Sequence, residues 1–160
     1  MKLISKYYVS LILLVLSVTV EAKLEADIAQ VLRVVDGDSI TVKVDQTNYR
    51  IRLAEIDAPE MAQPWGKESK SALREKLQDK EVALEVIDAD RYGRLVARVF
   101  LNGRQINREM VEEGHAWVYL EYLRDDSLLK PEATAKRKKI GLWGFEGAIP
   151  PWEWRKSKRK

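Results

Sequence analysis

Residues 31–60 read VLRVVDGDSITVKVDQTNYRIRLAEIDAPE, and this stretch decides the fold. It sets two acidic turn motifs, Asp36-Gly37-Asp38 and Asp57-Ala58-Pro59-Glu60, among residues that are typical of three consecutive strands. Carboxylates at strand ends can converge on one point while a rigid sheet fixes their spacing. The stretch therefore predicts a hard-cation site on a β-sheet scaffold.

Five segments have the apolar alternation and the β-branched residues of strands. They are residues 28–35, 39–44, 49–56, 82–87 and 95–101. Asp36-Gly37 favours a hairpin turn with positive φ angles between the first two. A small closed barrel is the favoured arrangement, although composition alone does not distinguish it from an open sheet.

Three helices are expected among and after these strands, which makes the chain α+β. Residues 67–78 have helical apolar spacing, residues 107–113 begin at a capping Asn107, and residues 131–140 begin at Pro131. The tryptophans after Gly141 are interpreted as packing residues that fasten a carboxyl-terminal segment, not as base-binding platforms.

Residues 1–22 resemble a secretory signal peptide. Lys2 and Lys6 form a basic start, residues 7–20 are almost wholly apolar, and Val20-Glu21-Ala22 offers small residues for cleavage. The alternative is an uncleaved amino-terminal anchor. Either reading places the folded part in a secreted or periplasmic location.

Composition narrows the chemistry of any metal site. The chain has no cysteine and one histidine, His115, so a zinc site is improbable and the fold stands without disulfides. The net charge of +3 is small, and the basic runs at 136–139 and 155–160 are interpreted as solvated faces or tails.

The acidic motifs together predict phosphodiester chemistry. Asp38 and Asp57 are expected to face each other across one rim, with the Ala58 carbonyl as a further oxygen ligand. Calcium is favoured over magnesium because it tolerates such an irregular ligand set. Glu60 could orient a water as general base, while Arg52 and Arg94 could bind the charged oxygens of a phosphate.

Each motif has a simpler explanation when taken alone. Asp-Gly-Asp is usually a turn, and Arg52 could pair with Glu55 or Glu85 on the surface. Two alternatives therefore stay open beside hydrolysis. One is a non-catalytic nucleic-acid-binding barrel, and the other is a protein whose calcium is only structural.

In its joint pattern the chain resembles the staphylococcal nuclease, or thermonuclease, family. The matching segments are VVDGDSITV, YRIRLAEIDAPE, DRYGR and, more loosely, INREMVEEGHAWVY and EATAKRKKIGLW. The resemblance implies a five-stranded OB-fold barrel with three helices. It also implies a calcium-dependent nuclease that cuts DNA and RNA and leaves 3′-phosphate products.

The resemblance assigns roles residue by residue. It implies Asp38, Asp57 and the Ala58 carbonyl as calcium ligands, with Asp36 as a nearby carboxylate, and Arg52, Glu60 and Arg94 as catalytic residues. It implies Arg91, Tyr92 and Tyr122 as substrate-binding residues. Three departures from the family pattern concern substrate binding or the metal turn: Ala58 replaces a threonine, Leu120 replaces a tyrosine, and the loop after Glu60 is shorter.

The expected organisation is a leader over residues 1–22, a nuclease domain over 26–145, and a Trp-rich basic tail over 146–160. The expected partners are DNA and RNA. We expect the chain to act as a monomer, with no stable membrane partner once the leader is cleaved.

Overall fold

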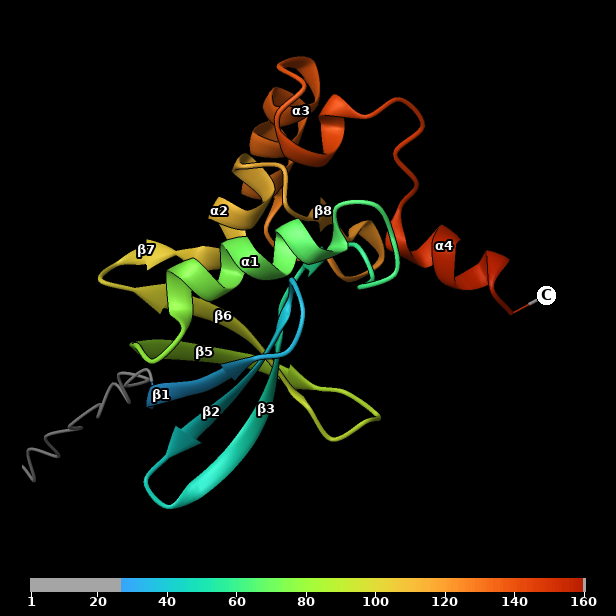
Figure 1. Cartoon of the computed structure of the whole chain (residues 1–160). Helices are drawn as coiled ribbons and strands as arrows, with labels where there is room; N and C mark the ends of the chain where they lie inside the picture. Colours follow the sequence, from blue (N-terminus) through green and yellow to red (C-terminus); the bar gives the residue numbers. More distant parts are fainter. Residues whose placement is uncertain (1–26, 160) are drawn as a thin grey trace, which may run out of the picture.

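A computed structural model describes residues 27–159, and its centre is a closed barrel of five long strands (Figure 1). These strands are β1 (Asp27–Val34), β2 (Ser39–Val44), β3 (Thr47–Leu53), β5 (Glu81–Ala89) and β6 (Leu95–Leu101). The sheet order is β3-β2-β1-β5-β6-β7, where β7 (Arg104–Gln105) is a short edge strand. The predicted strands are confirmed: 39–44 and 95–101 have the predicted bounds, and the ends of the other three differ by one to three residues.

One parallel pairing closes the barrel. β3 runs beside β6 with Ile51 opposite Leu95 and Leu53 opposite Ala97, whereas the other neighbouring strands are antiparallel. A closed sheet leaves few unpaired edges, and its strand ends meet at a common rim. The expectation of a closed barrel in an α+β fold is confirmed.

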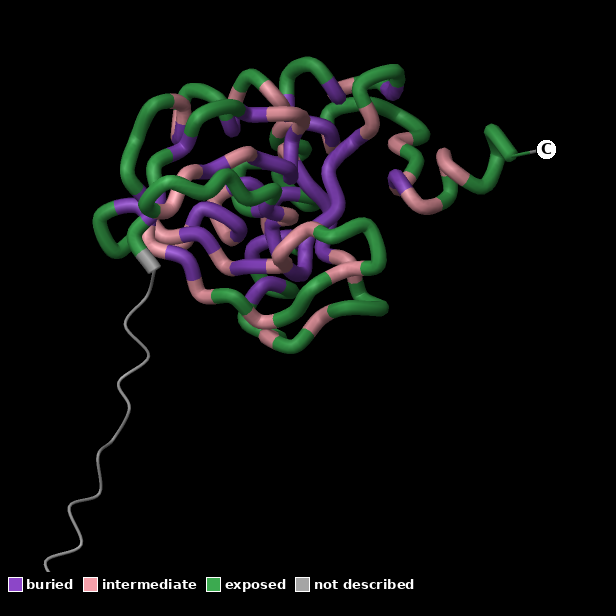
Figure 2. The backbone as a smooth tube through the Cα atoms, turned by 90° about the horizontal axis from the view of Figure 1, so that it is seen from below, coloured by how far each residue is buried: buried purple, intermediate pink, exposed green. Residues whose placement is uncertain are grey.

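The barrel interior is an apolar core. Val31, Val42, Ile51 and Val99 are fully buried, and Figure 2 shows buried segments gathered in the middle of the molecule. Burying side chains of this size stabilises the fold by about 1.5–3 kcal/mol each. This packing gives the rim a rigid support.

The described residues contain four α-helices, one more than the sequence predicts. They are α1 (Gly66–Leu77), α2 (Ile106–Glu112), α3 (Leu129–Arg137) and α4 (Pro151–Ser157). The first three gather around one end of the barrel, and α4 projects to one side (Figure 1). The unpredicted α4 begins with Pro151 in its first turn, which suits the fixed φ of proline.

Asn107 does not cap α2, so this prediction was wrong. The helix begins at Ile106 after Gln105, and the Asn107 side chain is buried. Its amide donates to the carbonyls of Ala54 and Ala97 and accepts from the Val99 amide at 2.9 Å. Asn107 is therefore a bridge between α2 and the barrel, because a buried amide must satisfy its donors and acceptor.

The end of α3 also differs from the prediction. The helix ends at Arg137, and Lys139 has a positive φ of 55°. Its start lies two residues before Pro131, so the proline still falls in the first turn.

Gly37 is needed for space and not for a positive φ. It is absent from the positive-φ residues, and a Cβ there would lie 2.7 Å from the Cβ of Ala58 and would also collide with Ser69 on α1. The turn between β1 and β2 thus packs directly under the Asp57-Ala58 turn. This contact brings the two acidic motifs together.

Among the described residues, none of the helices combines the length and apolar character that a membrane crossing requires. The leader expected over residues 1–22 lies outside the described residues. The expected tail over 146–160 contains α4.

Candidate active site

The two acidic motifs and the predicted arginines line one cleft at the barrel rim. The cleft has a volume of about 830 Å³. Its walls come from the β5–β6 connection on one side and α4 on the other, and both project from the same side of the barrel (Figure 1). Every predicted site residue lines it: Asp36, Asp38, Arg52, Asp57, Ala58, Glu60, Arg91, Tyr92, Arg94 and Tyr122.

Arg52 joins the two predicted metal-binding carboxylates. Its Nη1 lies 3.1 Å from Asp38 Oδ2, and its Nη2 lies 2.8 Å from Asp57 Oδ1. The strand holds the arginine in place, since Nη1 also donates to the Leu53 carbonyl at 3.0 Å. One guanidinium reaches both acids, so the oxygens of Asp38 and Asp57 converge on one point. The alternative that Arg52 pairs with Glu55 or Glu85 is wrong, because Arg98 takes both of those acids.

Asp38 is fixed from several directions. It precedes β2, and its Oδ2 accepts the Ala58 amide at 2.6 Å while Oδ1 accepts the Ser39 hydroxyl at 3.0 Å. Its own amide donates to Asp36 at 3.1 Å. Burial and the nearby charge of Asp38 raise the pKa of Asp36 to about 6. The turn therefore holds Asp38 rigidly beside the Asp57-Ala58 turn, with Asp36 behind it.

Asp57 is almost completely buried and needs compensating charge. It lies in β4 (Ile56–Asp57), which pairs with β8 (Trp117–Val118), and 2 % of it is exposed. Burial raises the pKa of Asp57, and the hydrogen bond from Arg155 and the charge of Arg52 oppose that rise. A buried carboxylate is tolerated when cations surround it.

Glu60 is more exposed and faces the same cleft. Its side chain is 42 % exposed, and its Oε1 accepts from Arg155 Nη1 at 2.8 Å. The turn around it is closed by Gln63, whose Oε1 accepts the Glu60 amide at 3.1 Å. A half-exposed carboxylate beside two buried acids suits a residue that exchanges a proton with water.

Arg94 lies on the facing wall. Its Nε pairs with Asp90 at 2.7 Å, and its Nη1 reaches the Ser39 hydroxyl at 3.4 Å, next to Asp38. Hydrogen bonds from the Arg94 amide and side chain outweigh burial and lower the pKa of Asp90. Asp90 therefore orients Arg94 toward the centre while leaving most of the guanidinium donors open.

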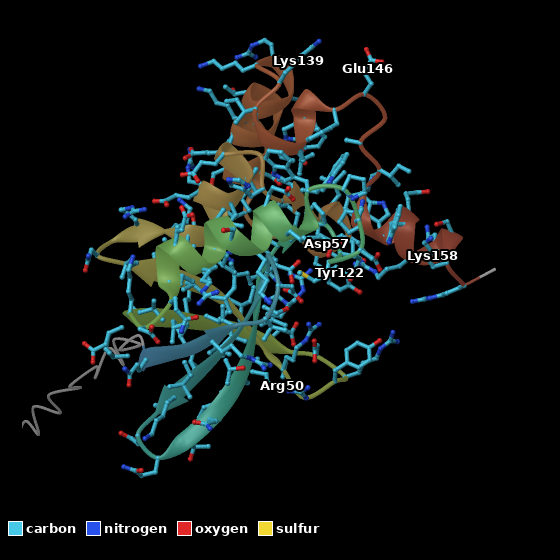
Figure 3. All side chains as sticks on the ribbon, viewed as in Figure 1. Arg50, Asp57, Tyr122, Lys139, Glu146 and Lys158 are labelled. Carbon is cyan, nitrogen blue, oxygen red and sulfur yellow. The ribbon has the colours of Figure 1, made fainter. Side chains whose placement is uncertain are left out.

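The outer part of the cleft is aromatic and basic. Arg91 Nη2 donates to the Tyr92 hydroxyl at 2.9 Å, and Arg50 holds this connection through the Tyr92 carbonyl at 2.6 Å. Tyr122, in the 3₁₀ turn η1 (Leu120–Tyr122), lies edge-on to Tyr119 at 4.8 Å. Tyr122 and Asp57, both labelled in Figure 3, line the same cleft. Exposed rings beside guanidinium groups suit stacked bases and their phosphates.

The donor set fits a hard cation. Asp38 and Asp57 supply carboxylate oxygens, which calcium prefers. In the described part of the chain, no three His, Asp or Glu side chains converge closely enough to enclose a metal. A cation at this site would therefore need backbone oxygen and water besides these two acids, an irregular ligand set that calcium accepts.

Sequence reasoning missed Arg155 and the buried Glu55. Arg155 reaches Asp57 and Glu60 from α4, so the interpretation of residues 155–160 as a solvated tail is wrong for this residue. Its signal was the spacing of Trp152 and Arg155, which lie on one face of a short helix after Pro151. Glu55 had no comparable signal, because it holds Arg98 and the amides of Arg124 and Asp125 through contacts distant in sequence.

His115 packs within the fold and does not line the cleft. It is half-buried, its Nδ1 accepts from Trp65 Nε1 at 3.2 Å, and burial lowers its pKa.

Trp143 and Trp152 pack edge-on against Trp117, which confirms that these tryptophans fasten the carboxyl-terminal segment.

Comparisons with known proteins agree with this geometry. The family model described as "Staphylococcal nuclease homologue" matches residues 50–144, more than half of the chain. The chain is similar to Micrococcal nuclease of Shigella flexneri, with 37 % identity over 81 % of this chain and 81 % of that one. It is similar to Protein ParB of Escherichia coli, with 38 % identity over 79 % and 78 %. It is also similar to an uncharacterized endonuclease of Haemophilus influenzae, with 36 % identity over 96 % of this chain and 87 % of that one. The chain therefore belongs to the staphylococcal nuclease family.

Proposed function

We propose that this chain is a calcium-dependent nuclease that hydrolyses phosphodiester bonds in DNA and RNA and leaves 3′-phosphate products. The family supports nuclease activity on nucleic acids. The observation that carries the finer proposal is the convergence of Asp38 and Asp57 on Arg52, in a cleft that Glu60 and Arg94 also line.

Asp38 and Asp57 would hold the calcium ion, with the Ala58 carbonyl as a further ligand. When bound, the ion would supply positive charge that stabilises negative charge on a phosphate. Its ligands require ionised carboxylates. The arginines around Asp57 favour that form despite the burial of the side chain.

The chain's own residues account for the remaining chemistry. Glu60 accepts a proton from an attacking water at its exposed carboxylate. Arg52 and Arg94 donate hydrogen bonds to phosphate oxygens, whose negative charge increases as the water attacks. The oxygen of the water forms a bond to phosphorus as the bond from phosphorus to the 5′-oxygen breaks. The 5′-oxygen leaves and takes up a proton from solvent to become a 5′-hydroxyl, and the phosphate stays on the 3′-oxygen.

Substrate enters along the aromatic and basic wall. Arg91 and Tyr92 contact phosphate and sugar, and Tyr122 stacks against a base. In this mode of binding the side chains contact the sugar-phosphate backbone of the nucleic acid and one face of a base. DNA and RNA share both features, so either can bind. We propose that the chain acts as a monomer after export to a secreted or periplasmic location, with removal of residues 1–22 and no stable membrane partner.

Digestion of single-stranded DNA and RNA by wild type and Glu60→Gln tests the proposal. The substitution keeps size and polarity but removes the base, so the cleavage rate should fall by on the order of 10²-fold or more. Glu68→Gln, an exposed acid on α1, is the matched control and should cleave at the wild-type rate.

Two results would contradict the proposal. Unchanged cleavage by Glu60→Gln would remove Glu60 from the mechanism. A folded wild type that binds single-stranded DNA without cutting it would favour the non-catalytic nucleic-acid-binding barrel instead. Analysis of product ends settles which side of the broken bond keeps the phosphate.

A further inference from the structure

Arg155 enters the active centre from outside the segment that the family model matches. The match ends at residue 144, whereas Arg155 lies on α4. Its Nη2 lies 2.8 Å from Asp57 Oδ2, and its Nη1 lies 2.8 Å from Glu60 Oε1 and 3.3 Å from Asp57 Oδ1. One guanidinium thus contacts an acid proposed to bind the cation and the acid proposed as base.

The docking of α4 aims Arg155 at these acids. Trp152 lies three residues earlier, on the same helix face, and its ring stacks on Tyr119 at 5.2 Å with an interplanar angle of 6°. Trp152 also lies edge-on to Trp117, the neighbour of Asp57 across the β4–β8 pair. The ring therefore anchors the helix, so that Arg155 can change partners by rotating its own side chain.

The two arginines on Asp57 differ in freedom. The Arg52 side chain is 13 % exposed and is held by a strand and by the Leu53 carbonyl. The Arg155 side chain is 33 % exposed and extends from a helix of seven residues. A long, partly solvated side chain can leave a carboxylate at lower cost than a buried one. Arg155 is thus the more easily displaced of the two.

We propose that Arg155 is an exchangeable cation of the active centre, which neutralises Asp57 and Glu60 before the divalent ion binds and then transfers to a nucleic-acid phosphate. This inference rests on the proposed function. Asp57 cannot give the same oxygens to a guanidinium and to a metal ion, so the two cations compete. A guanidinium fork fits phosphate as well as it fits carboxylate, which gives the displaced side chain a new partner in the cleft.

The exchange predicts effects of opposite sign on two affinities. Loss of Arg155 removes a competitor, so calcium should bind more tightly when no nucleic acid is present. Loss of Arg155 also removes a phosphate ligand, so calcium-loaded protein should bind single-stranded DNA more weakly. A residue with a merely structural role would not move the two affinities in opposite directions.

Calorimetric titration of the full chain tests this inference without relying on turnover. Calcium is titrated into wild type, Arg155→Ala and Lys156→Ala, the last of which removes the same charge from the same helix. Arg155→Ala should lower the Kd for calcium by about five- to tenfold, a coupling of ordinary size between two sites. A short phosphorothioate-linked oligodeoxythymidylate, titrated in saturating calcium, should bind Arg155→Ala about tenfold more weakly. Lys156→Ala should follow wild type in both titrations.

Each other outcome overturns the inference. Equal or weaker calcium binding by Arg155→Ala would exclude competition and leave the proposed nuclease intact. Tighter calcium binding with unchanged oligonucleotide binding would exclude the transfer to phosphate. A wild type that binds no calcium would overturn the proposed calcium dependence and this inference together. If Arg155→Ala does not fold, Arg155→Lys replaces it and should give a smaller shift of the same sign, because an ammonium cannot bridge two groups as a planar fork does.

Discussion

Arg52 links the two acidic motifs, because its side chain contacts an aspartate from each of them. Its guanidinium spans Asp38 and Asp57, and both acids are buried. A lysine has one compact ammonium and cannot reach both acids in the same planar geometry. The arrangement therefore depends on the fork and not only on the positive charge.

Arg52→Lys should lower the rate of single-stranded DNA cleavage by on the order of 10²-fold. The loss arises because the ammonium cannot donate to two phosphate oxygens at once. Steady-state cleavage assays measure it, and Arg33→Lys, an exposed arginine on β1, should cleave at the wild-type rate. Near-normal cleavage by Arg52→Lys would contradict the requirement for a guanidinium at this position.

Glu55 holds the 119–125 segment onto the barrel. It is buried, has a φ of 67°, and accepts from Arg98 Nε at 2.8 Å and from the amides of Arg124 and Asp125 at 2.8 and 2.7 Å. Burial alone would raise the pKa of Glu55, but these hydrogen bonds outweigh it and lower the pKa. One carboxylate thereby places the turn that carries Tyr122.

Glu55→Gln should reduce the free energy of unfolding by about 2–4 kcal/mol, because it puts an amide donor where Oε2 accepts from Arg98 and removes the negative charge that strengthens the hydrogen bonds from the two backbone amides. Chemical denaturation measures the loss. Glu85→Gln removes the more exposed partner of Arg98 and should cost about 1 kcal/mol or less. Equal losses in the two variants would show that the buried hydrogen bonds of Glu55 contribute little.

At the scale of elements, Glu109 links three parts of the fold. It lies on α2 and pairs with Arg104 on β7 at 2.6 Å and with Lys76 on α1 at 3.0 Å. The hydrogen bond from Arg104, together with Lys76, lowers the pKa of Glu109 from 4.5 to about 2 although burial opposes the shift.

The lowered pKa of Glu109 fixes the sign of its effect on stability. The folded state binds its proton less readily than the unfolded state, so the carboxylate stabilises the fold fully above pH 4.5 and loses that contribution as the pH falls toward 2. Glu109→Gln should therefore reduce the free energy of unfolding by about 1 kcal/mol at pH 7, and the difference from wild type should vanish near pH 2. Denaturation at several pH values checks this, and a difference that grows toward low pH would contradict it.

The joint between α2 and the carboxyl-terminal segment depends on Gly114. Its φ is +67°, its carbonyl accepts the Leu142 amide at 2.9 Å, and a Cβ would collide with the Ile140 carbonyl. The backbones at Gly114 and at Ile140 to Leu142 therefore lie close together, where the chain leaves α3 and runs toward α4.

Gly114→Ala should lower the free energy of unfolding by about 2–4 kcal/mol, which combines backbone strain with the collision. Gly103→Ala is the matched control, because its φ is +78° but nothing lies within 4 Å of the new Cβ. Its cost should stay near 1 kcal/mol, as expected for the strain alone. Thermal or chemical denaturation compares them, and equal losses would exclude the collision as a cause.

At the scale of the whole molecule, local patterns predicted the strands and the acidic turns, and they favoured a closed barrel without distinguishing it from an open sheet. The alternation in 39–44 and the acidic turns are properties of short stretches, and a closed barrel then brings Asp38, Arg52 and Asp57 to one rim. Arg94, a predicted site residue, also lines the observed cleft, whereas the sequence does not predict its partner Asp90.

The missed features depend on contacts between residues far apart in the sequence. Arg155 meets Asp57 across 98 positions, and Glu55 meets Arg124 across 69. Asn107 has the local signature of a helix cap. Its side-chain amide instead donates to the buried carbonyls of Ala54 and Ala97, which are distant in sequence. Local propensity could not reveal these partners, because it contains no information about which distant backbone groups are left unpaired.

Calcium-titrated cleavage of single-stranded DNA by the wild-type chain tests the central claim most directly. If the rim acids bind calcium and the arginines bind the phosphate that is cut, cleavage should rise with calcium to saturation and stop on addition of chelator. A folded, calcium-saturated protein that leaves the DNA intact would contradict the claim.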